Sequence, residues 1–254
     1  MTRRRWIADE WTETSAVLKN DQAAHLARVL RAQAGQQFDI VAGEKVRRGI
    51  IQGITDETVE FSLHEELDAT GSLPLVIALS IIRFERMEWA IEKLTELGVE
   101  QIVPVVAQRS EKHLAQAAAK RVERWRKIAR ESAQQSRRSN VPEISEPIHL
   151  PEWLKKSQPQ EPQYGLRLLL SEHEQSRSLR EIMEAQRLSS AETSAAKITA
   201  AIGPEGGWTE AECTRFRDCG WQPITLGPRI LRAETAAMAF ASVVNAWLAA
   251  PSAS

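Results

Sequence analysis

The chain has 254 residues, of which 43% are hydrophobic and 26% charged, and its formal net charge is −1 at pH 7. This length allows one large or two modest domains, each with its own core. The two cysteines have no Cys or His neighbours at metal-ligand spacing, which argues against a disulfide framework and against a bound metal. No apolar run reaches the length of a membrane span, and the basic N-terminus lacks the apolar core of a signal peptide. We therefore expect a cytoplasmic protein with no membrane partner.

The first part of the chain has the pattern of a small antiparallel β-barrel. Short alternating stretches at residues 38–41, 49–54 and 58–63 are separated by turn-forming residues. One stretch, residues 22–31, has a helical apolar face instead. Residues 68–74 are small, polar or helix-breaking and show no periodicity, which is typical of a linker. We therefore predict one domain over residues 1–72 and a second over residues 73–254.

The second part alternates between strands and helices. Strands are predicted at residues 75–82, 102–106, 167–170, 197–202 and 222–226, and helices at residues 87–97, 122–136, 179–185 and 233–249. Thr209 and Glu212 have the spacing of a capping box, so another helix should begin directly after residue 209. Such alternation predicts an α/β fold with a parallel sheet covered by helices. Ligands on these sheets bind at the carboxyl ends of the strands.

Two glycine-rich loops follow the last two predicted strands. The first reads Ile-Gly-Pro-Glu-Gly-Gly-Trp at residues 202–208, and the second reads Leu-Gly-Pro-Arg-Ile-Leu-Arg-Ala-Glu-Thr at residues 226–235. Glycines at these positions allow the backbone to approach a small ligand closely. The loops lack the Lys and Ser/Thr of a phosphate-binding loop, and Glu205 would repel an anion. A cationic ligand such as S-adenosylmethionine fits better than a nucleotide phosphate, although ordinary strand-to-helix turns remain an alternative.

These loops resemble the C-terminal signature of the SPOUT methyltransferases, and in detail that of the RsmE family, which methylates N3 of a uridine in bacterial 16S ribosomal RNA. The resemblance extends to Met-Glu-Trp at residues 87–89, Lys93, Thr-Glu-Leu-Gly-Val at residues 95–99 and Arg-Ser at residues 109–110. Residues 131–138 and the His-Leu-x-x-Val-Leu-Arg stretch at residues 25–31 are also similar to family segments. The chain departs from the family pattern at Gln134, at Arg137 and at residues 5–7, where Arg-Trp-Ile replaces a more usual Arg-Phe-Phe.

The resemblance implies a C-terminal SPOUT-type parallel sheet with a trefoil knot and a small N-terminal PUA-like β-barrel that binds RNA. It also implies a homodimer that forms through the knot region, S-adenosylmethionine as cofactor, and 16S rRNA of the small ribosomal subunit as partner. The cofactor-binding residues that it implies are Ser171, Glu172, Ile202, Gly203, Pro204, Glu205, Gly206, Gly207, Leu226, Gly227, Ile230, Leu231 and Ala236. The RNA-binding residues that it implies are Arg3, Arg4, Arg5, His25, Arg28, Arg31, Arg109, Gln135, Ser136 and Arg138.

The chemistry of methyl transfer suggests which residues are catalytic. Uridine N3 carries a proton, so the site needs a base, or a cation that stabilises charge developing on the uracil oxygens. Arg232 is the candidate cation, and Glu205 and Glu234 are candidate bases or ligand contacts. Arg232 could instead form a structural ion pair, and Glu234 could simply favour a helix N-terminus.

Two alternatives to uridine methylation of 16S rRNA stay open. A SPOUT enzyme could act on another RNA. The chain could also be a non-catalytic RNA-binding protein of ribosome assembly, which would not bind S-adenosylmethionine. Clusters of basic residues outside the glycine loops agree with an RNA-binding surface in each case, although a single cluster is more often a solvated helix face.

Overall fold

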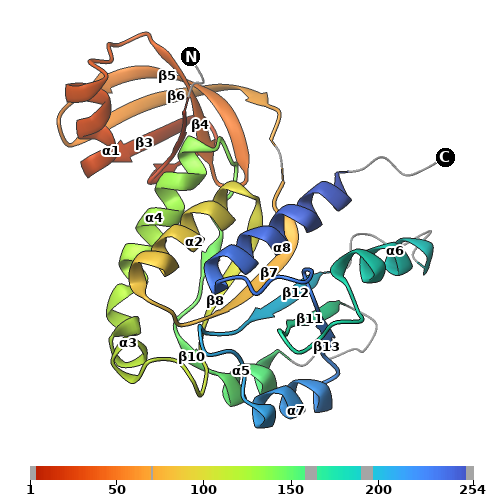
Figure 1. Cartoon of the computed structure of the whole chain (residues 1–254). Coiled ribbons are helices and arrows are strands. Elements are labelled where there is room, and N and C mark those ends of the chain that lie inside the picture. Colours follow the sequence, from red (N-terminus) through yellow and green to blue (C-terminus); the bar gives the residue numbers. More distant parts are fainter. Residues whose placement is uncertain (1–3, 70, 158–164, 190–196, 250–254) are drawn as a thin grey trace. The chain divides into compact units, whose positions relative to one another are not determined.

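The computed structural model describes residues 4–69, 71–157, 165–189 and 197–249 (Figure 1). The chain divides into two compact units. Unit 1 consists of Met1–Ser72 and Arg130–Val141, and unit 2 consists of Leu73–Ala129 and Pro142–Ser254. Each unit therefore contains two separate stretches of the sequence.

Unit 1 is built on a curled six-stranded sheet with the strand order β1-β4-β5-β6-β3-β2. The strands are β1 (Arg5–Ile7), β2 (Glu10–Trp11), β3 (Ser15–Lys19), β4 (Gln37–Ala42), β5 (Lys45–Ile54) and β6 (Thr58–Leu67). β1 and β2 lie at opposite edges but are separated by only Ala8 and Asp9, whose backbone N–H groups donate to Val41 and Val17 at 2.9 Å. One continuous segment therefore connects the two edges, which curls the sheet. The expectation of an antiparallel sheet is wrong at one pair, because β1 runs parallel to β4.

The helical stretch of unit 1 differs from the regular helix expected at residues 22–31. It begins as α1 (Asn20–Ala24) and continues as a π-helical turn, η1 (His25–Val29). The Leu30 N–H donates to the His25 carbonyl at 3.0 Å, five residues back. Arg31 then has a φ of 50°, which ends the helix. The turn buries Leu26 among the core residues of the sheet, which include Trp6 and Phe61.

Residues 130–141 complete unit 1. They include the end of helix α4 (Val122–Gln135) and the chain that follows it. Arg130 Nη2 donates to Asp9 Oδ1 at 2.7 Å and to the Ile7 carbonyl at 2.8 Å. The carbonyl of Arg137 accepts from Arg5 at 2.6 Å, and the Arg137 guanidinium pairs with buried Asp39 at 3.0 Å. The short chain between Ile7 and Glu10 is thus held by a segment more than a hundred residues later in the sequence.

Unit 2 contains a parallel sheet with the order β10-β8-β7-β12-β11-β13, and β9 pairs with β8. Its strands are β7 (Leu73–Ser80), β8 (Val99–Val106), β9 (Glu143–Ile144), β10 (Ile148–His149), β11 (Leu166–Leu170), β12 (Ile198–Ile202) and β13 (Gln222–Ile224). Its remaining helices are α2 (Phe84–Glu96), α3 (Lys112–Ala117), η2 (Ala118–Arg121), α5 (Leu150–Lys156), α6 (Leu179–Ser189), α7 (Glu210–Asp218) and α8 (Ala233–Leu248). The predicted alternation of strands and helices is present, whereas α3, β9, β10 and α5 were not expected.

Helices cover both faces of this sheet (Figure 1). α8 packs against α2, β7 and β12. α5 and α7 cover the opposite face, where Trp153, Phe216 and Trp221 pack with Val76 and Ala78 of β7. The expected trefoil knot stays a prediction. None of the helices in the described ranges is both long and apolar enough to cross a bilayer.

Candidate active site

Three neighbouring strands of unit 2 end around one cavity of about 770 Å³. β12, β11 and β13 lie side by side and in parallel, so the chain that follows each of them reaches the same edge of the sheet. Residues implied by the family resemblance that line the cavity are Ser171, Glu172, Ile202, Gly203, Pro204, Glu205, Gly207, Leu226, Gly227, Ile230, Leu231, Arg232 and Ala236. The cavity has the size of a cofactor site. Its lining also includes residues that the sequence did not single out, among them His173, Thr225 and Arg229.

The first glycine loop is fixed at both of its ends. Gly207 has a φ of 67°, a conformation that favours glycine, and its N–H donates to the Pro204 carbonyl at 2.8 Å. Trp208 Nε1 donates to the Leu170 carbonyl at 3.2 Å, which connects the loop to the end of β11. The ring of Trp208 also packs on Phe216 at 4.9 Å, as expected for a residue that fastens the helix.

The helix after this loop begins with the predicted capping box. The Glu212 N–H donates to Thr209 Oγ1 at 3.3 Å, and the Thr209 N–H donates to Glu212 Oε2 at 2.8 Å. The second carboxylate oxygen of Glu212 accepts the backbone N–H of Gln108 at 2.7 Å. Buried Glu212 therefore fixes both the start of α7 and the chain that follows β8.

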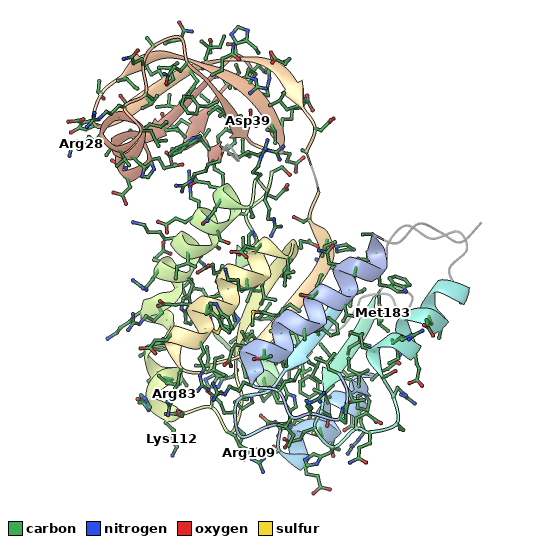
Figure 2. All side chains as sticks on the ribbon, turned by 45° about the horizontal axis from the view of Figure 1, so that its top comes forward. Arg28, Asp39, Arg83, Arg109, Lys112 and Met183 are labelled. Atoms are coloured by element: carbon green, nitrogen blue, oxygen red, sulfur yellow. The ribbon has the colours of Figure 1, made fainter. Side chains whose placement is uncertain are left out.

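Gly206 does not line the cavity. Its carbonyl accepts from Arg109 Nη1 at 2.6 Å, and the same nitrogen is 3.4 Å from the Trp208 carbonyl. Arg109 was expected to contact RNA, and it lies with exposed Arg83 and Lys112 at one end of unit 2 (Figure 2). The side chains of Arg83 and Lys112 have no hydrogen bond or ion pair within the described ranges, so they are free to bind an anion.

The second glycine loop leads directly into α8. Gly227 has a φ of 123°, and its N–H donates to Thr225 Oγ1 at 3.1 Å. Arg232 is the N-cap of α8, and its carbonyl accepts the Ala236 N–H at 2.8 Å. Arg232 lines the cavity, and its side chain has no ion pair or hydrogen bond to any other described residue. Ile230 of the same loop is 83% exposed.

The two candidate carboxylates lie on either side of an arginine that the sequence did not single out. Glu205 lines the cavity, whereas Glu234 does not and is buried. Arg86 Nη1 lies 3.4 Å from Glu205 Oε1, and Arg86 Nε lies 3.7 Å from Glu234 Oε1. Glu234 Oε2 is buried and has no hydrogen-bond partner among the described residues. The only signal for Arg86 in the sequence was its place directly before the Met-Glu-Trp motif.

Several of the expected RNA-binding residues of unit 1 are bound within that unit. Arg5 is buried and donates to the carbonyls of Arg137 and Asp68 at 2.6 and 2.8 Å. Arg138 is buried, donates to Ser72 Oγ at 2.9 Å, and has its pKa lowered to about 10 by burial. Arg4 donates to Gln134 at 2.5 Å and lies 4.9 Å over the ring of Trp6. These three guanidinium groups hold the unit together, which leaves them fewer donors for a phosphate.

The other expected RNA contacts of unit 1 are more accessible. Arg28 is exposed and pairs with Asp56 at 2.7 Å (Figure 2). Arg31 is exposed and has no ion pair within the described ranges. His25 packs beside Trp6 at a ring distance of 5.8 Å, Gln135 is exposed, and the Ser136 hydroxyl donates to the Ser132 carbonyl at 2.7 Å. Arg3 lies outside the described residues.

The residues that the structure describes include no group of three or more His, Cys, Asp or Glu side chains that could hold a metal ion. The two cysteines are free thiols. Burial raises the pKa of the Cys213 thiol, which lines the cavity beside Trp208. The polar groups that line the cavity include carboxylates, guanidinium groups, hydroxyls, backbone amides, the imidazole of His173 and the side-chain amide of Gln175.

Comparisons with known proteins find related domains and related whole chains. An RNA methyltransferase domain matches residues 70–245, and an RNA methyltransferase PUA domain matches residues 18–63. The chain is 33% identical to Ribosomal RNA small subunit methyltransferase E of Rickettsia conorii, covering 92% of this chain and 91% of that protein. It is 32% identical to the protein of that name from Synechocystis, and the match covers 93% of this chain and 74% of that protein.

Solved structures are similar over nearly the whole chain. Ribosomal RNA small subunit methyltransferase E from Neisseria gonorrhoeae, bound to S-adenosylmethionine, is 27% identical with a TM-score of 0.80, covering 96% of this chain and 97% of that one. A putative methyltransferase from Legionella pneumophila, in complex with the same cofactor, is 26% identical with a TM-score of 0.80, covering 97% and 98%.

Proposed function

Because this chain belongs to the RNA methyltransferase family that includes Ribosomal RNA small subunit methyltransferase E, we propose that it methylates N3 of a uridine in 16S rRNA. The methyl donor is S-adenosylmethionine. The small-subunit rRNA follows from the names of the relatives, and the uridine N3 follows from the resemblance of the glycine loops and of residues 87–99 to the RsmE family.

The observation that carries the proposal is the cavity between the two glycine-rich loops. Its lining fits a cationic donor, because it contains three carboxylates, those of Glu172, Glu174 and Glu205, against two guanidinium groups, those of Arg229 and Arg232. Gly207 supports the fit, since a Cβ there would lie 2.9 Å from Glu172 Oε1 and would displace this carboxylate of the lining. When bound, S-adenosylmethionine supplies an activated methyl group on a sulfonium.

The residues of the chain would then orient the acceptor uridine and stabilise the negative charge that develops on it. In an in-line displacement, the new N–C bond forms as the C–S bond breaks, so the acceptor nitrogen must lie behind the methyl carbon. The N3 proton must leave before or during this step. Arg232 would stabilise the negative charge that develops on the uracil oxygens, because it lines the cavity and has no carboxylate partner among the described residues. Glu205, which lines the cavity, is the better placed of the two candidate bases.

The two parts of the chain would have separate tasks. We assign RNA binding to residues 1–72, as a PUA-like domain, and methyl transfer to residues 73–254. The apolar character of α8 supports burial against a second copy of the chain, so a homodimer and the associated knot belong to the proposal. A protein that acts on ribosomal RNA would work in the bacterial cytoplasm, and the proposal includes neither a metal nor a membrane partner.

Two measurements test the proposed function. Calorimetry with S-adenosylhomocysteine should detect one site per chain, and mass mapping of 16S rRNA treated with the protein and S-adenosylmethionine should find a single added methyl group on a uridine. Binding of the cofactor product without methylation of 16S rRNA would favour an enzyme for another RNA. Absence of cofactor binding would favour a non-catalytic assembly protein.

A further inference from the structure

Arg86 joins three segments of unit 2 that are far apart in the sequence. It belongs to the first turn of α2, and its guanidinium lies 3.4 Å from Glu205 of the first glycine loop. On its other side, Nε lies 3.7 Å from Glu234 in the first turn of α8. Glu234 follows Arg232 of the second glycine loop by two residues. Arg86 therefore contacts the first glycine loop through Glu205 and the start of α8 through Glu234, although Arg86 does not itself line the cavity.

The two carboxylates differ in their exposure to solvent. The side chain of Glu234 is 4% exposed, whereas that of Glu205 is 35% exposed and lines the cavity. A buried carboxylate requires a nearby positive charge, and Arg86 is the one cation that pairs with Glu234 among the described residues. Arg86 is therefore held by buried Glu234 and restrains the more exposed Glu205.

This restraint matters because Glu205 and Arg232 line the same cavity. A carboxylate and a guanidinium that line one cavity can form a two-point hydrogen-bonded pair when they meet. Arg232 is exposed and nevertheless has no ion pair within the described ranges. Glu205 is the one cavity-lining carboxylate that pairs with an arginine among the described residues, and that arginine is Arg86.

We propose that Arg86 is a positioning residue for methyl transfer: it holds Glu205 away from Arg232 and so keeps the Arg232 guanidinium available to the RNA substrate. The proposal rests on the proposed function and on the role of Arg232 in it. Without Arg86, Glu205 would pair with Arg232, and the charge that should stabilise the uracil oxygens would be occupied before the substrate binds.

The test is single-turnover methylation of 16S rRNA by the full chain, together with calorimetry with S-adenosylhomocysteine. Arg86→Gln should lower the methylation rate on the order of tenfold, with a change of less than about threefold in affinity for S-adenosylhomocysteine. Arg86→Lys should retain most of the rate, because it keeps a positive charge between the two carboxylates. In a Glu205→Gln background, adding Arg86→Gln should change the rate little, because an amide at that position cannot neutralise Arg232.

Loss of the Arg86→Gln effect in the Glu205→Gln background is the result that a purely structural role of Arg86 would not produce. A normal rate in Arg86→Gln, or an equal drop in rate in both backgrounds, would overturn the proposal. If Arg86→Gln fails to fold because Glu234 is left unpaired, the comparison is repeated with Glu234→Gln present in both proteins. Arg180→Gln is the matched control: it breaks an exposed arginine–carboxylate pair, with Glu184 at 2.7 Å, away from the cavity, and should leave the rate unchanged.

Arg232→Ala separates this inference from the proposed function. A normal rate in Arg232→Ala would remove the role of Arg232 and the inference with it. A slow Arg232→Ala with a normal Arg86→Gln would leave Arg232 in place and remove only the role of Arg86. Absence of S-adenosylhomocysteine binding by the unaltered chain would instead overturn the proposed function itself.

Discussion

Glu172 and Gly207 both line the cavity and lie so close together that a Cβ on Gly207 would be 2.9 Å from Glu172 Oε1. Glu172 follows β11, and Gly207 belongs to the loop after β12. Because Gly207 also has a φ of 67°, a side chain there would be strained even if Glu172 moved aside. The close contact between Glu172 and the loop after β12 therefore requires a residue without a side chain at position 207.

Gly207→Ala should lower the free energy of unfolding by about 1–2 kcal/mol, because an L-residue is strained at this φ. It should also weaken S-adenosylhomocysteine binding, because Glu172 must leave its place in the lining. Gly206→Ala is the comparison, since its φ is not positive and its Cβ would meet its nearest neighbour, Arg109 Cδ, at an ordinary 3.4 Å. Chemical denaturation and calorimetry measure both effects. Equal losses in the two variants would contradict the role given to Gly207.

Arg232→Ala should lower the methylation rate on the order of a hundredfold while affinity for S-adenosylhomocysteine changes little. The reason is that the charge on the uracil oxygens develops only as N3 loses its proton. Arg232→Lys should recover only part of the rate, because a point charge cannot reproduce a planar guanidinium facing a carbonyl. Single-turnover kinetics on 16S rRNA decide the matter. A defect limited to folding or to self-association would make Arg232 structural.

Arg31→Ala and Arg5→Ala should fail in different ways. Arg31 is exposed and unpaired within the described ranges, so its loss should weaken RNA binding and reduce the slope of log affinity against log salt by roughly 0.7 to 0.9. Arg5 is buried and donates to two carbonyls, so its loss should lower the free energy of unfolding by about 2–3 kcal/mol. Salt-dependent RNA binding and chemical denaturation separate the two outcomes. A stable Arg5→Ala with weakened RNA binding would return Arg5 to the RNA-binding surface.

Cys213 should react slowly with iodoacetamide in a Cys219→Ser variant, where it is the remaining cysteine. Only the thiolate reacts, and burial raises the pKa of the Cys213 thiol. Its rate should therefore keep rising above about pH 8.5, the usual thiol pKa. Because Cys213 lines the cavity, S-adenosylhomocysteine should slow the reaction further. A rate that reaches its plateau below pH 8, or that ignores the cofactor product, would contradict this placement.

Most elements of unit 2 could be predicted because buried parallel strands and amphipathic helices leave strong periodic signals. β7, β8, β11 and β12 each fall within three residues of their expected start. β9 and β10 have two residues each, which is too short for any period to show, and α5 is a single short helix. The π-helical turn at His25–Val29 was missed because its residues satisfy an ordinary helical pattern as well.

The candidate site also has some features that the sequence shows and others that it does not. Glycine-rich loops after strands are visible in a sequence, because the residue type itself reports the backbone conformation. Charge pairing is not visible, since it depends on which side chains meet in space. Arg86 was not singled out in the sequence, yet it bridges two carboxylates more than a hundred residues away. Arg5 and Arg138 were expected to bind RNA, yet both are buried inside unit 1.

The return of residues 130–141 to unit 1 sets an order of events during protein synthesis. The ribosome adds about 5–20 residues per second, so roughly 4 to 15 s pass between the emergence of the last strand of the curled sheet and that of Val141. During this interval Asp39 has Arg48 as a partner but not yet Arg137, and Arg5 lacks the carbonyl of Arg137. The N-terminal sheet can therefore form early, but it becomes fully bonded only when more than half of the chain has been made.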